Sequence, residues 1–297
     1  MKFGKVIVEQ SGSAEVFADM IAELHLKPPI LVKPNWGFSK CFTEAQILDW
    51  VLSAVDGEAL VVESYGWART EEALLGKGLG SKQRGALRKS DQWFLGYSGV
   101  GEVLKKHSVE YSNLTEEVWK HRVVEPQIIR ETVEAKYPPV QMTELYNMVP
   151  TRIYNLRGGT LLSLAKIRAG VPPIMASLSV KNLFGLITTP SRAKFHGEKN
   201  SLLAQSIVDI NKIYRSLFDV KGIVEAVFTA SNIEGAIVKG SGIVLASEDT
   251  VGLDAFTASL AGIDPNQVEH LKLAAECFGK WDNRNIARGK QSGIRVF

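Results

Sequence analysis

Ile30-Leu31-Val32-Lys33 is an apolar run that ends in a charged residue, and Pro34-Asn35-Trp36 follows it at once. Residues 59–63 repeat this pattern. Apolar residues that continue without alternation predict strands buried on both faces. Residues 13–26 and 43–55 show the three-and-four spacing of helices, so right-handed β-α-β units are expected. The predicted fold class is therefore α/β, with a mixed, largely parallel sheet and flanking helices.

The same alternation continues towards the C-terminus. Further apolar runs predict strands at residues 5–8, 122–124, 152–156, 161–167, 223–228 and 242–246. Helical spacing predicts helices at residues 201–218, 250–261 and 265–278, the last beginning at Asp264-Pro265. Residues 131–150 contain three prolines and are interpreted as an excursion or lid. We interpret residues 1–297 as a single α/β unit; the alternative is a two-lobed arrangement with its seam near residue 150.

Composition excludes several classes of protein. The 297 residues are 45% hydrophobic and 23% charged, which is ordinary for a globular chain. The net charge of +3 is too small to predict nucleic-acid binding. No window approaches the roughly 20 apolar residues that a membrane span needs, and Val6-Ile7-Val8 is too short for a signal-peptide core. Cys41 and Cys277 form neither a disulfide framework nor a zinc set, so a cytoplasmic location is expected.

Polar residues end two of the predicted strands. Ligands of open α/β sheets bind beyond the carboxyl ends of strands, which makes Lys33 and Asn35 candidate ligand-binding residues. The alternative is a strand cap in which Asn35 bonds its own backbone in a turn fixed by Pro34. Glu63 is a candidate base or metal ligand, or else the partner of Lys33 in a structural ion pair.

The densest functional signal is SLSVKNLFG at residues 177–185, which contains Lys181 and Asn182 and precedes Arg192 and His196. Lysine and arginine donate to phosphate or carboxylate, and an asparagine amide both donates and accepts. His196 is a candidate for proton transfer or metal binding. The alternative is a solvated basic loop. Because lysine is rarely buried among apolar residues, the binding interpretation is favoured.

Two further candidates lie elsewhere. Lys166 and Arg168 place cations at a predicted strand end, either exposed on one face or within the same anion site; Lys166 is the one assigned to ligand binding. Asp254 lies four residues inside a predicted helix, where the helix dipole favours a carboxylate that still faces the site. The sequence contains no dinucleotide fingerprint, Walker sequence, nucleophile elbow or paired-histidine metal motif.

Five stretches occur in the order expected of the domain-of-unknown-function 362 family, which the chain resembles over roughly residues 5–289. They are KPNW at 33–36, VVES at 61–64, LLSLAK at 161–166, SLSVKNLFGLITTPSRAKFHG at 177–197 and GIVLASEDTVGLDAFTASLAGIDPNQVEHLKLAAE at 242–276. The resemblance implies a site built from Lys33, Asn35, Glu63, Lys166, Lys181, Asn182, Arg192, His196 and Asp254.

The resemblance also implies a redox context, because many relatives carry ferredoxin-like cysteine clusters. Two distant cysteines do not supply the four thiolates of a cluster, so no iron–sulfur cluster is expected to be held by this chain alone. Relatives often have a Lys-Thr-His-like run after the position of Lys166, where this chain has Arg168-Ala169-Gly170. A weaker similarity of architecture links the family to the lactate-racemase nickel-cofactor proteins, but fold analogy does not transfer function.

Two functional hypotheses follow. In the first, the chain is an enzyme acting on a small anionic metabolite: Lys181, Lys33 and Arg192 hold the anion, and His196 or Glu63 moves a proton. Neighbouring cations depress the pKa of a lysine, which makes Lys181 a candidate acid–base or Schiff-base residue. In the second, the chain is a non-catalytic carrier of a cofactor or metal for a redox protein. The sequence identifies no cofactor or metal; a homo-oligomer or a redox-protein partner is expected.

Overall fold

The computed structural model describes residues 1–66, 84–170 and 174–297. Within these ranges an eight-stranded sheet has the order β1-β2-β12-β9-β6-β3-β4-β5, and a four-stranded sheet has the order β11-β10-β7-β8. The strands of the large sheet are β1 (Lys2–Phe3), β2 (Val6–Glu9), β3 (Ile30–Pro34), β4 (Ala59–Glu63), β5 (Glu110–Asn113), β6 (Thr160–Lys166), β9 (Asp219–Ala226) and β12 (Ile243–Ser247). Those of the small sheet are β7 (Arg168–Ala169), β8 (Ala176–Ser177), β10 (Thr229–Ser231) and β11 (Ile237–Lys239).

The large sheet is mixed and largely parallel, which confirms the predicted fold class. The adjacent strands β9, β6, β3, β4 and β5 run parallel to one another. Strand β12 is antiparallel to both of its neighbours, β9 and β2. Every residue of β3 and of β6 is buried, as expected for strands covered on both faces.

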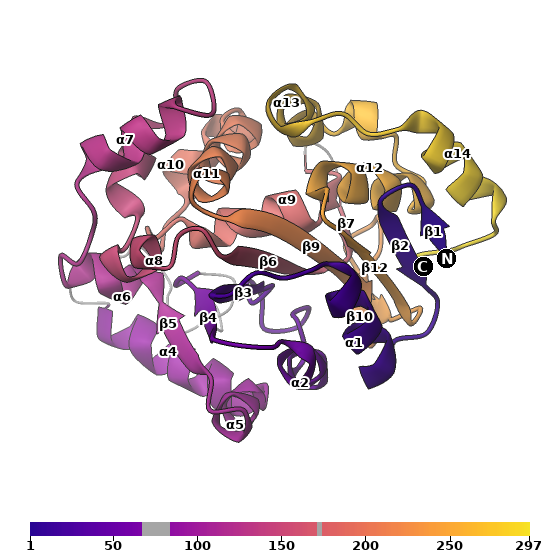
Figure 1. Cartoon of the computed structure of the whole chain (residues 1–297), viewed down its shortest axis with the longest axis horizontal. Coiled ribbons are helices and arrows are strands. Elements are labelled where there is room, and N and C mark those ends of the chain that lie inside the picture. The colour runs from indigo at the N-terminus through magenta and orange to yellow at the C-terminus, as the bar shows by residue number, and fades with distance from the viewer. Residues whose placement is uncertain (67–83, 171–173) are drawn as a thin grey trace.

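Helices cover both faces of this sheet, and Figure 1 shows them as layers above and below the strands. The layer below the sheet in that view contains α1 (Ala14–Glu23), α2 (Ala45–Ala54), α4 (Arg84–Tyr97) and α5 (Val100–Lys106). The layer above contains α7 (Pro126–Glu134), α9 (Ser179–Asn182), α10 (Ala193–His196), α11 (Leu203–Leu217), α12 (Thr250–Leu260), α13 (Glu269–Phe278) and α14 (Asn283–Gln291). The shorter helices α6 (Leu114–Trp119) and α8 (Thr151–Asn155) lie near β5.

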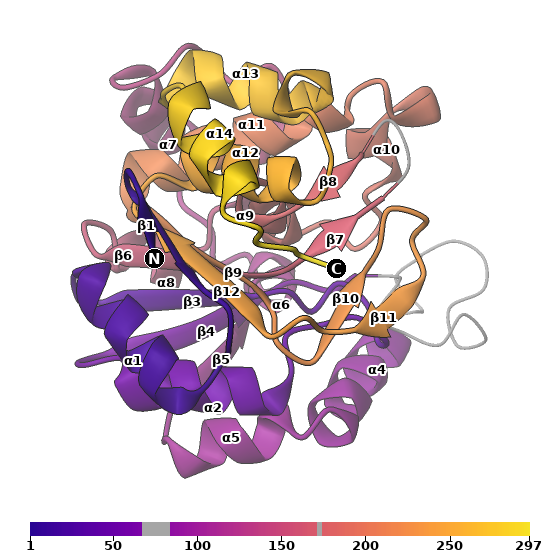
Figure 2. The same cartoon turned by 90° about the vertical axis from the view of Figure 1, so that its right-hand side faces the viewer.

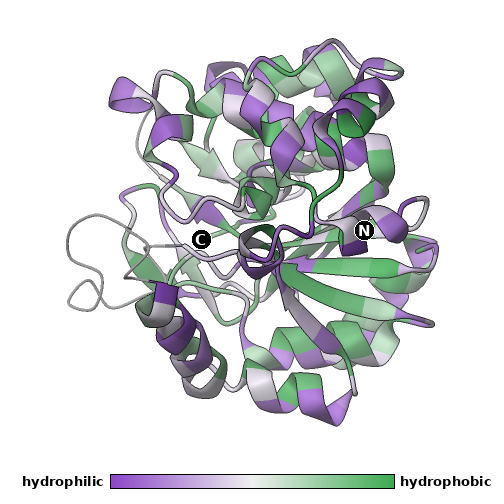
Figure 3. Ribbon diagram, turned by 90° about the vertical axis from the view of Figure 1, so that its left-hand side faces the viewer, coloured by the Kyte–Doolittle hydropathy of each residue, from purple (hydrophilic) through white to green (hydrophobic). Residues whose placement is uncertain are grey.

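Two apolar clusters form the core, one on each face of the large sheet. The side chains of consecutive strand residues point to opposite faces, so Leu161 belongs to the cluster under α11 and α12, whereas Leu162 belongs to the cluster under α1 and α2. Figure 3 shows the strands in the green of apolar residues, with purple stretches on the helices outside them. Figure 2 shows the small sheet beside this core, at the end where β6 continues into β7.

The order of the parallel strands creates a switch point between β3 and β6. The chain proceeds from β3 to β4 and β5 in one direction, and then β6 pairs with β3 on its other side. The connections on the two sides of this point diverge and leave a crevice beyond the carboxyl ends of the strands. Residues around Pro34 and Lys166, which end β3 and β6, therefore border that crevice.

Three predictions of local structure are wrong. Residues 152–156 form α8 rather than a strand, and residues 122–124 contribute only the isolated bridge between Val123 and Pro150. Runs of three to five apolar residues do not separate strands from single helical turns. The helix predicted at residues 265–278 is divided into a 3₁₀ turn, η6 (Pro265–Gln267), and α13. The predicted excursion contains the end of α7 and the 3₁₀ helix η3 (Thr143–Met148).

In the described ranges, no helix has the length and apolarity to cross a membrane.

Candidate functional site

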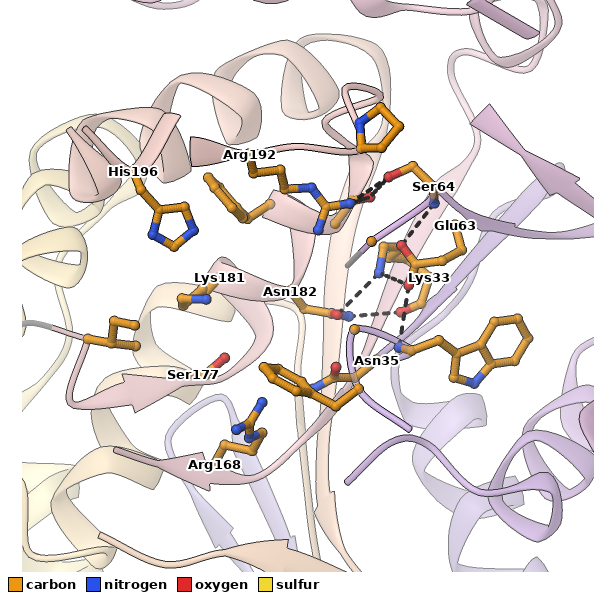
Figure 4. Close-up of a pocket in the computed structure, with 18 of the residues that line it drawn as sticks. Lys33, Asn35, Glu63, Ser64, Arg168, Ser177, Lys181, Asn182, Arg192 and His196 are labelled. Carbon is orange, nitrogen blue, oxygen red and sulfur yellow. Dashed lines mark hydrogen bonds and ion pairs between the residues drawn. The ribbon is translucent and has the colours of Figure 1, made fainter. Parts of the chain in front are cut away.

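A pocket of ≈ 510 Å³ opens at the switch point, beyond the carboxyl ends of β3 and β4. Figure 4 shows the polar residues that line it. Seven of the nine predicted site residues lie in its wall: Lys33, Asn35, Glu63, Lys181, Asn182, Arg192 and His196. Segments distant in the sequence therefore meet here, because β3 and β4 supply one wall while β7, α9 and α10 supply the other.

The wall formed by β3 and β4 contains a buried ion pair. Lys33 Nζ lies 2.8 Å from Glu63 Oε2, and the two side chains are 1% and 3% exposed. Lys33 Nζ also donates to the carbonyl oxygen of Pro34 at 2.7 Å. Glu63 accepts from the backbone N–H groups of Ser64, at 3.0 Å, and of Trp36, at 3.3 Å. This is the structural ion pair that the sequence left as one of two alternatives, and its carboxylate already has several donors.

Asn182 connects this pair to α9. Its Oδ1 accepts from Lys33 Nζ at 3.3 Å, and its Nδ2 donates to the carbonyl oxygen of Lys33 at 2.8 Å and to Ser163 Oγ at 3.1 Å. The backbone of Gly185 lies directly against the ion pair: a Cβ at this position would be 2.6 Å from Lys33 Nζ and 3.0 Å from Glu63 Oε1. A side chain at this position would therefore displace the Lys33–Glu63 pair.

Arg192 fastens the segment after α9 to the end of β4. Its Nη2 donates to Ser64 Oγ at 2.7 Å and to the carbonyl oxygen of Gly185 at 3.1 Å. Ser64 Oγ in turn donates to the carbonyl oxygen of Ile187 at 2.9 Å. The guanidinium of Arg192 therefore lies on the pocket rim in a defined position.

Lys181 and Arg168 are the pocket cations without a carboxylate partner in the parts of the chain that the structure describes. The ammonium of Lys181 lies 5.5 Å from the centroid of the Phe184 ring. The guanidinium carbon of Arg168 lies 3.8 Å from the centroid of the Phe38 ring, and its buried Nε has no hydrogen-bond partner among the described residues. Burial, together with the nearby charges of Arg168 and Arg192, lowers the pKa of Lys181 to about 8.

His196 and Asn35 complete the polar lining. His196 Nδ1 lies 2.7 Å from Asn200 Oδ1, and its ring meets the Phe184 ring edge-on with centroids 5.3 Å apart. The backbone N–H of Asn35 donates to Thr43 Oγ1 at 2.9 Å. Thr43 therefore fixes the loop after β3, and Glu44 is the N-cap residue of α2.

Lys166 was assigned to ligand binding from the sequence, but it does not line the pocket. It lies opposite Glu225 in the parallel pairing of β6 with β9, and its Nζ is 2.7 Å from Glu225 Oε1. It also pairs with Glu44, and its side chain is fully buried. Its charge is therefore balanced within the fold.

Asp254 does not line the pocket either, but it holds the helix that does. Its carboxylate accepts from the N–H groups of Ser179, at 2.9 Å, and Val180, at 2.7 Å, and from Ser179 Oγ at 2.7 Å. These groups are at the start of α9, the turn that carries Lys181 and Asn182. Burial raises the pKa of Asp254 to about 7, and these hydrogen bonds oppose that rise.

The main residue that the sequence assignment omitted is Arg168. The predicted set includes Lys166 as a ligand-binding residue but not Arg168. Glu225, a carboxylate inside the apolar run of β9, indicates that a buried cation lies nearby, because a buried carboxylate needs compensation. That this cation is Lys166 follows from the register of β6 against β9, which the sequence does not show. Other lining residues absent from the predicted set include Phe38, Ser64, Ser177 and Phe184.

No group of three or more His, Cys, Asp or Glu side chains in the described ranges is arranged to hold a metal ion. Cys41 is buried and Cys277 partly buried, and both are free thiols.

Residues 161–259 match the model of the family described as domain of unknown function (DUF362). Within residues 161–259 this match confirms the resemblance seen in the sequence. The matched segment contains Arg168, Lys181, Asn182, Arg192 and His196, whereas Lys33 and Glu63 precede it. Neither the curated proteins nor the solved structures contain a match to the chain.

Proposed function

We propose that this chain, which carries the DUF362 segment at residues 161–259, binds a small organic anion in the pocket and acts on it by acid–base chemistry. The observation that carries the proposal is the pair formed by Lys181 and Arg168, two cations in one pocket with no carboxylate partner in the described ranges. An anionic ligand would supply the missing charge.

Other buried lysines of the chain support this interpretation by contrast. Lys33, Lys166 and Lys212 lie 2.8, 2.7 and 3.3 Å from carboxylate oxygens of the protein. Removing a cation from water is costly unless an opposite charge compensates it, and the fold compensates these three. Among the described lining residues the pocket has four Lys or Arg side chains but one carboxylate, that of Glu63, which already belongs to Lys33.

Lys181 is the residue best suited to move a proton. With a pKa of about 8, a fraction of its side chain is neutral near physiological pH, and the rest is a proton donor. His196 lines the same pocket and is the second candidate. Glu63 is the least suited of the three residues predicted to be catalytic, because Lys33 and two backbone N–H groups already donate to it.

The firm hydrogen bonding of Glu63 also supports the second candidate function, a carrier that holds an anionic cofactor without changing it. Binding requires Lys181 and Arg168 but needs no free base. Both functions predict the same pocket occupancy, and they differ in the fate of the ligand.

Binding is tested with inorganic phosphate and acetate as probes, by the rise in thermal unfolding temperature that a ligand of the native state produces. We expect both anions to stabilise the wild type and to lose that effect in Lys181→Ala. The matched control is Lys194→Ala, because Lys194 pairs with Glu144 on the surface, is 69% exposed and does not line the pocket. Equal stabilisation of wild type and Lys181→Ala would refute the proposal.

Native mass spectrometry of the freshly purified protein separates the two functions. An enzyme is expected to convert a co-purified anion over time, with conversion abolished in Lys181→Ala and slowed in His196→Gln. A ligand that remains unchanged in the wild type and stays bound to His196→Gln would support the carrier instead.

A further inference from the structure

Arg168 has an unusual environment for a partly buried guanidinium. Arg168 lies in β7, where it pairs with Ser177 of β8 and with Ser231 of β10. The two neighbouring strands therefore hold its backbone in place. Its guanidinium carbon lies 3.8 Å from the centroid of the Phe38 ring. Its Nε is buried and has no hydrogen-bond partner among the described residues.

Stacking and hydrogen bonding use different parts of a guanidinium. The aromatic ring occupies the face of the planar group, while the N–H donors lie in its plane and remain available. In Figure 4, Arg168 and Arg192 lie on opposite sides of the pocket, with Lys181 between them. A guanidinium fork beside an ammonium suits the two coplanar oxygens of a carboxylate.

The backbone donors that a phosphate group commonly uses are already taken here. Phosphates bind well at helix N-termini, where free N–H groups point at the ligand. At the start of α9 these groups, the N–H of Ser179 and of Val180, donate instead to Asp254. The anion site therefore depends on side-chain donors.

Apolar side chains form much of the remaining wall. The rings of Phe38 and Phe184 line the pocket and contact the cations Arg168 and Lys181, and Ile174 and Pro190 lie in the same lining. A ligand that fills this space needs an apolar portion next to its charged group.

We infer that the ligand is a carboxylate on an apolar body, with the carboxylate in the fork of Arg168 beside Lys181 and the body against Phe38 and Phe184. This inference rests on the proposed function and adds the chemical class of the ligand. It makes Arg168 the residue that holds the carboxylate, while the absence of free N–H donors at the start of α9 disfavours a phosphate.

Isothermal titration with benzoate and with phenyl phosphate tests it, because the two probes share a ring and differ in the anionic group. We expect the wild type to bind benzoate about tenfold more tightly than phenyl phosphate, and Arg168→Lys, which keeps the charge but loses the fork, to bind benzoate more weakly than the wild type. Phe38→Leu removes the stacking partner at a side chain that is 39% exposed, and should weaken benzoate binding without unfolding the protein. Arg130→Lys is the control, because Arg130 pairs with Glu134 on the surface.

The outcomes distinguish the inference from the function on which it rests. Equal or tighter binding of phenyl phosphate, or benzoate binding unchanged in both Arg168→Lys and Phe38→Leu, overturns the carboxylate assignment and leaves anion binding intact. Failure of the wild type to bind either probe overturns the proposed function and this inference together.

Discussion

Lys33 and Lys181 both line the pocket, and their different partners give them different chemistry. Lys33 lies 2.8 Å from Glu63 and donates to two further oxygens. Burial and the charges of Arg168 and Arg192 lower the pKa of Lys181 and so favour its neutral form. Residue type and spacing indicate both lysines as candidates, but they do not determine which one has a counterion.

The lowered pKa of Lys181 predicts that its amine reacts with acylating reagents at a lower pH than an ordinary lysine does. Because only the neutral amine attacks, trace acetylation followed by peptide mapping should show labelling of Lys181 with a midpoint near pH 8. Arg192→Ala removes a neighbouring positive charge and should move this midpoint upwards. A wild-type midpoint at about 10.4, the value of an unperturbed lysine, would contradict the assignment.

Gly185 has no room for a side chain. In Gly185→Ala the new Cβ would lie 2.6 Å from Lys33 Nζ, so the Lys33–Glu63 pair must move. We expect urea unfolding to show a loss of about 1–3 kcal/mol, the usual cost of overpacking. Gly96→Ala is the matched control, since a Cβ there would have no neighbour within 4 Å. Equal unfolding midpoints for the two variants would show that the pocket wall yields without cost.

At the scale of elements, the short helix α9 depends on a residue far from it in the chain. Asp254 is on α12, 75 residues beyond Ser179, yet it accepts both N–H groups at the start of α9. The long buried strands and α11 were predictable because their hydrophobic patterns are local and repeated. This contact was not, because nothing near Ser179 in the sequence indicates where its partner lies.

Removing that partner should disturb both stability and binding. Asp254→Ala leaves the buried N–H groups of Ser179 and Val180 without an acceptor, at a cost of about 1–3 kcal/mol for each group. Because α9 carries Lys181, we also expect weaker benzoate binding in calorimetric titrations. Asp264→Ala removes the exposed cap of η6 and is the control; it should leave binding unchanged. Wild-type affinity in Asp254→Ala would mean that α9 keeps its position without the carboxylate.

Across the whole chain, the burial of His270 in α13 makes folding stability depend on pH. His270 is 3% exposed, and its Nε2 has no partner among the described residues. Burial and the charge of Lys181 lower its pKa to about 3. The unfolded chain therefore takes up a proton at His270 near pH 6.5, whereas the folded chain does not. The free energy of unfolding is unaffected by this group above pH 6.5 and decreases as the pH falls from 6.5 towards 3.

Asp254 acts in the opposite direction. Its pKa is raised to about 7, so the folded chain binds that proton more readily than the unfolded chain, and stability from this group rises as the pH falls from 7 towards 4. Comparing variants at His270 removes this shared background. In urea unfolding between pH 7 and pH 4, His270→Phe should lose less stability than the wild type. His121→Asn, at an exposed histidine, should follow the wild type. Parallel curves for wild type and His270→Phe would exclude His270 as a source of acid sensitivity.

The overall architecture was the most predictable level, because buried strands alternating with amphipathic helices leave few arrangements. The place of the pocket followed from the same logic, since residues at the carboxyl ends of neighbouring parallel strands meet. The short elements were not predictable, as α8 shows. Which of Lys166 and Arg168 lines the pocket was not predictable either, because it depends on the register of β6 against β9.

Two separate parts of the chain form the pocket, and they contribute different features to it. Arg168, Lys181, Arg192 and His196 all come from one continuous part of the chain, whereas the Lys33–Glu63 pair is anchored in the central strands. Exchanging residues 168–196 would therefore replace the charged wall together with Asn182 and Gly185, which contact the ion pair, whereas Lys33 and Glu63 would stay in place at the ends of β3 and β4. The anion preference of such a chimera should change with the exchanged segment, provided that the new segment keeps the amide and the glycine that pack against the ion pair.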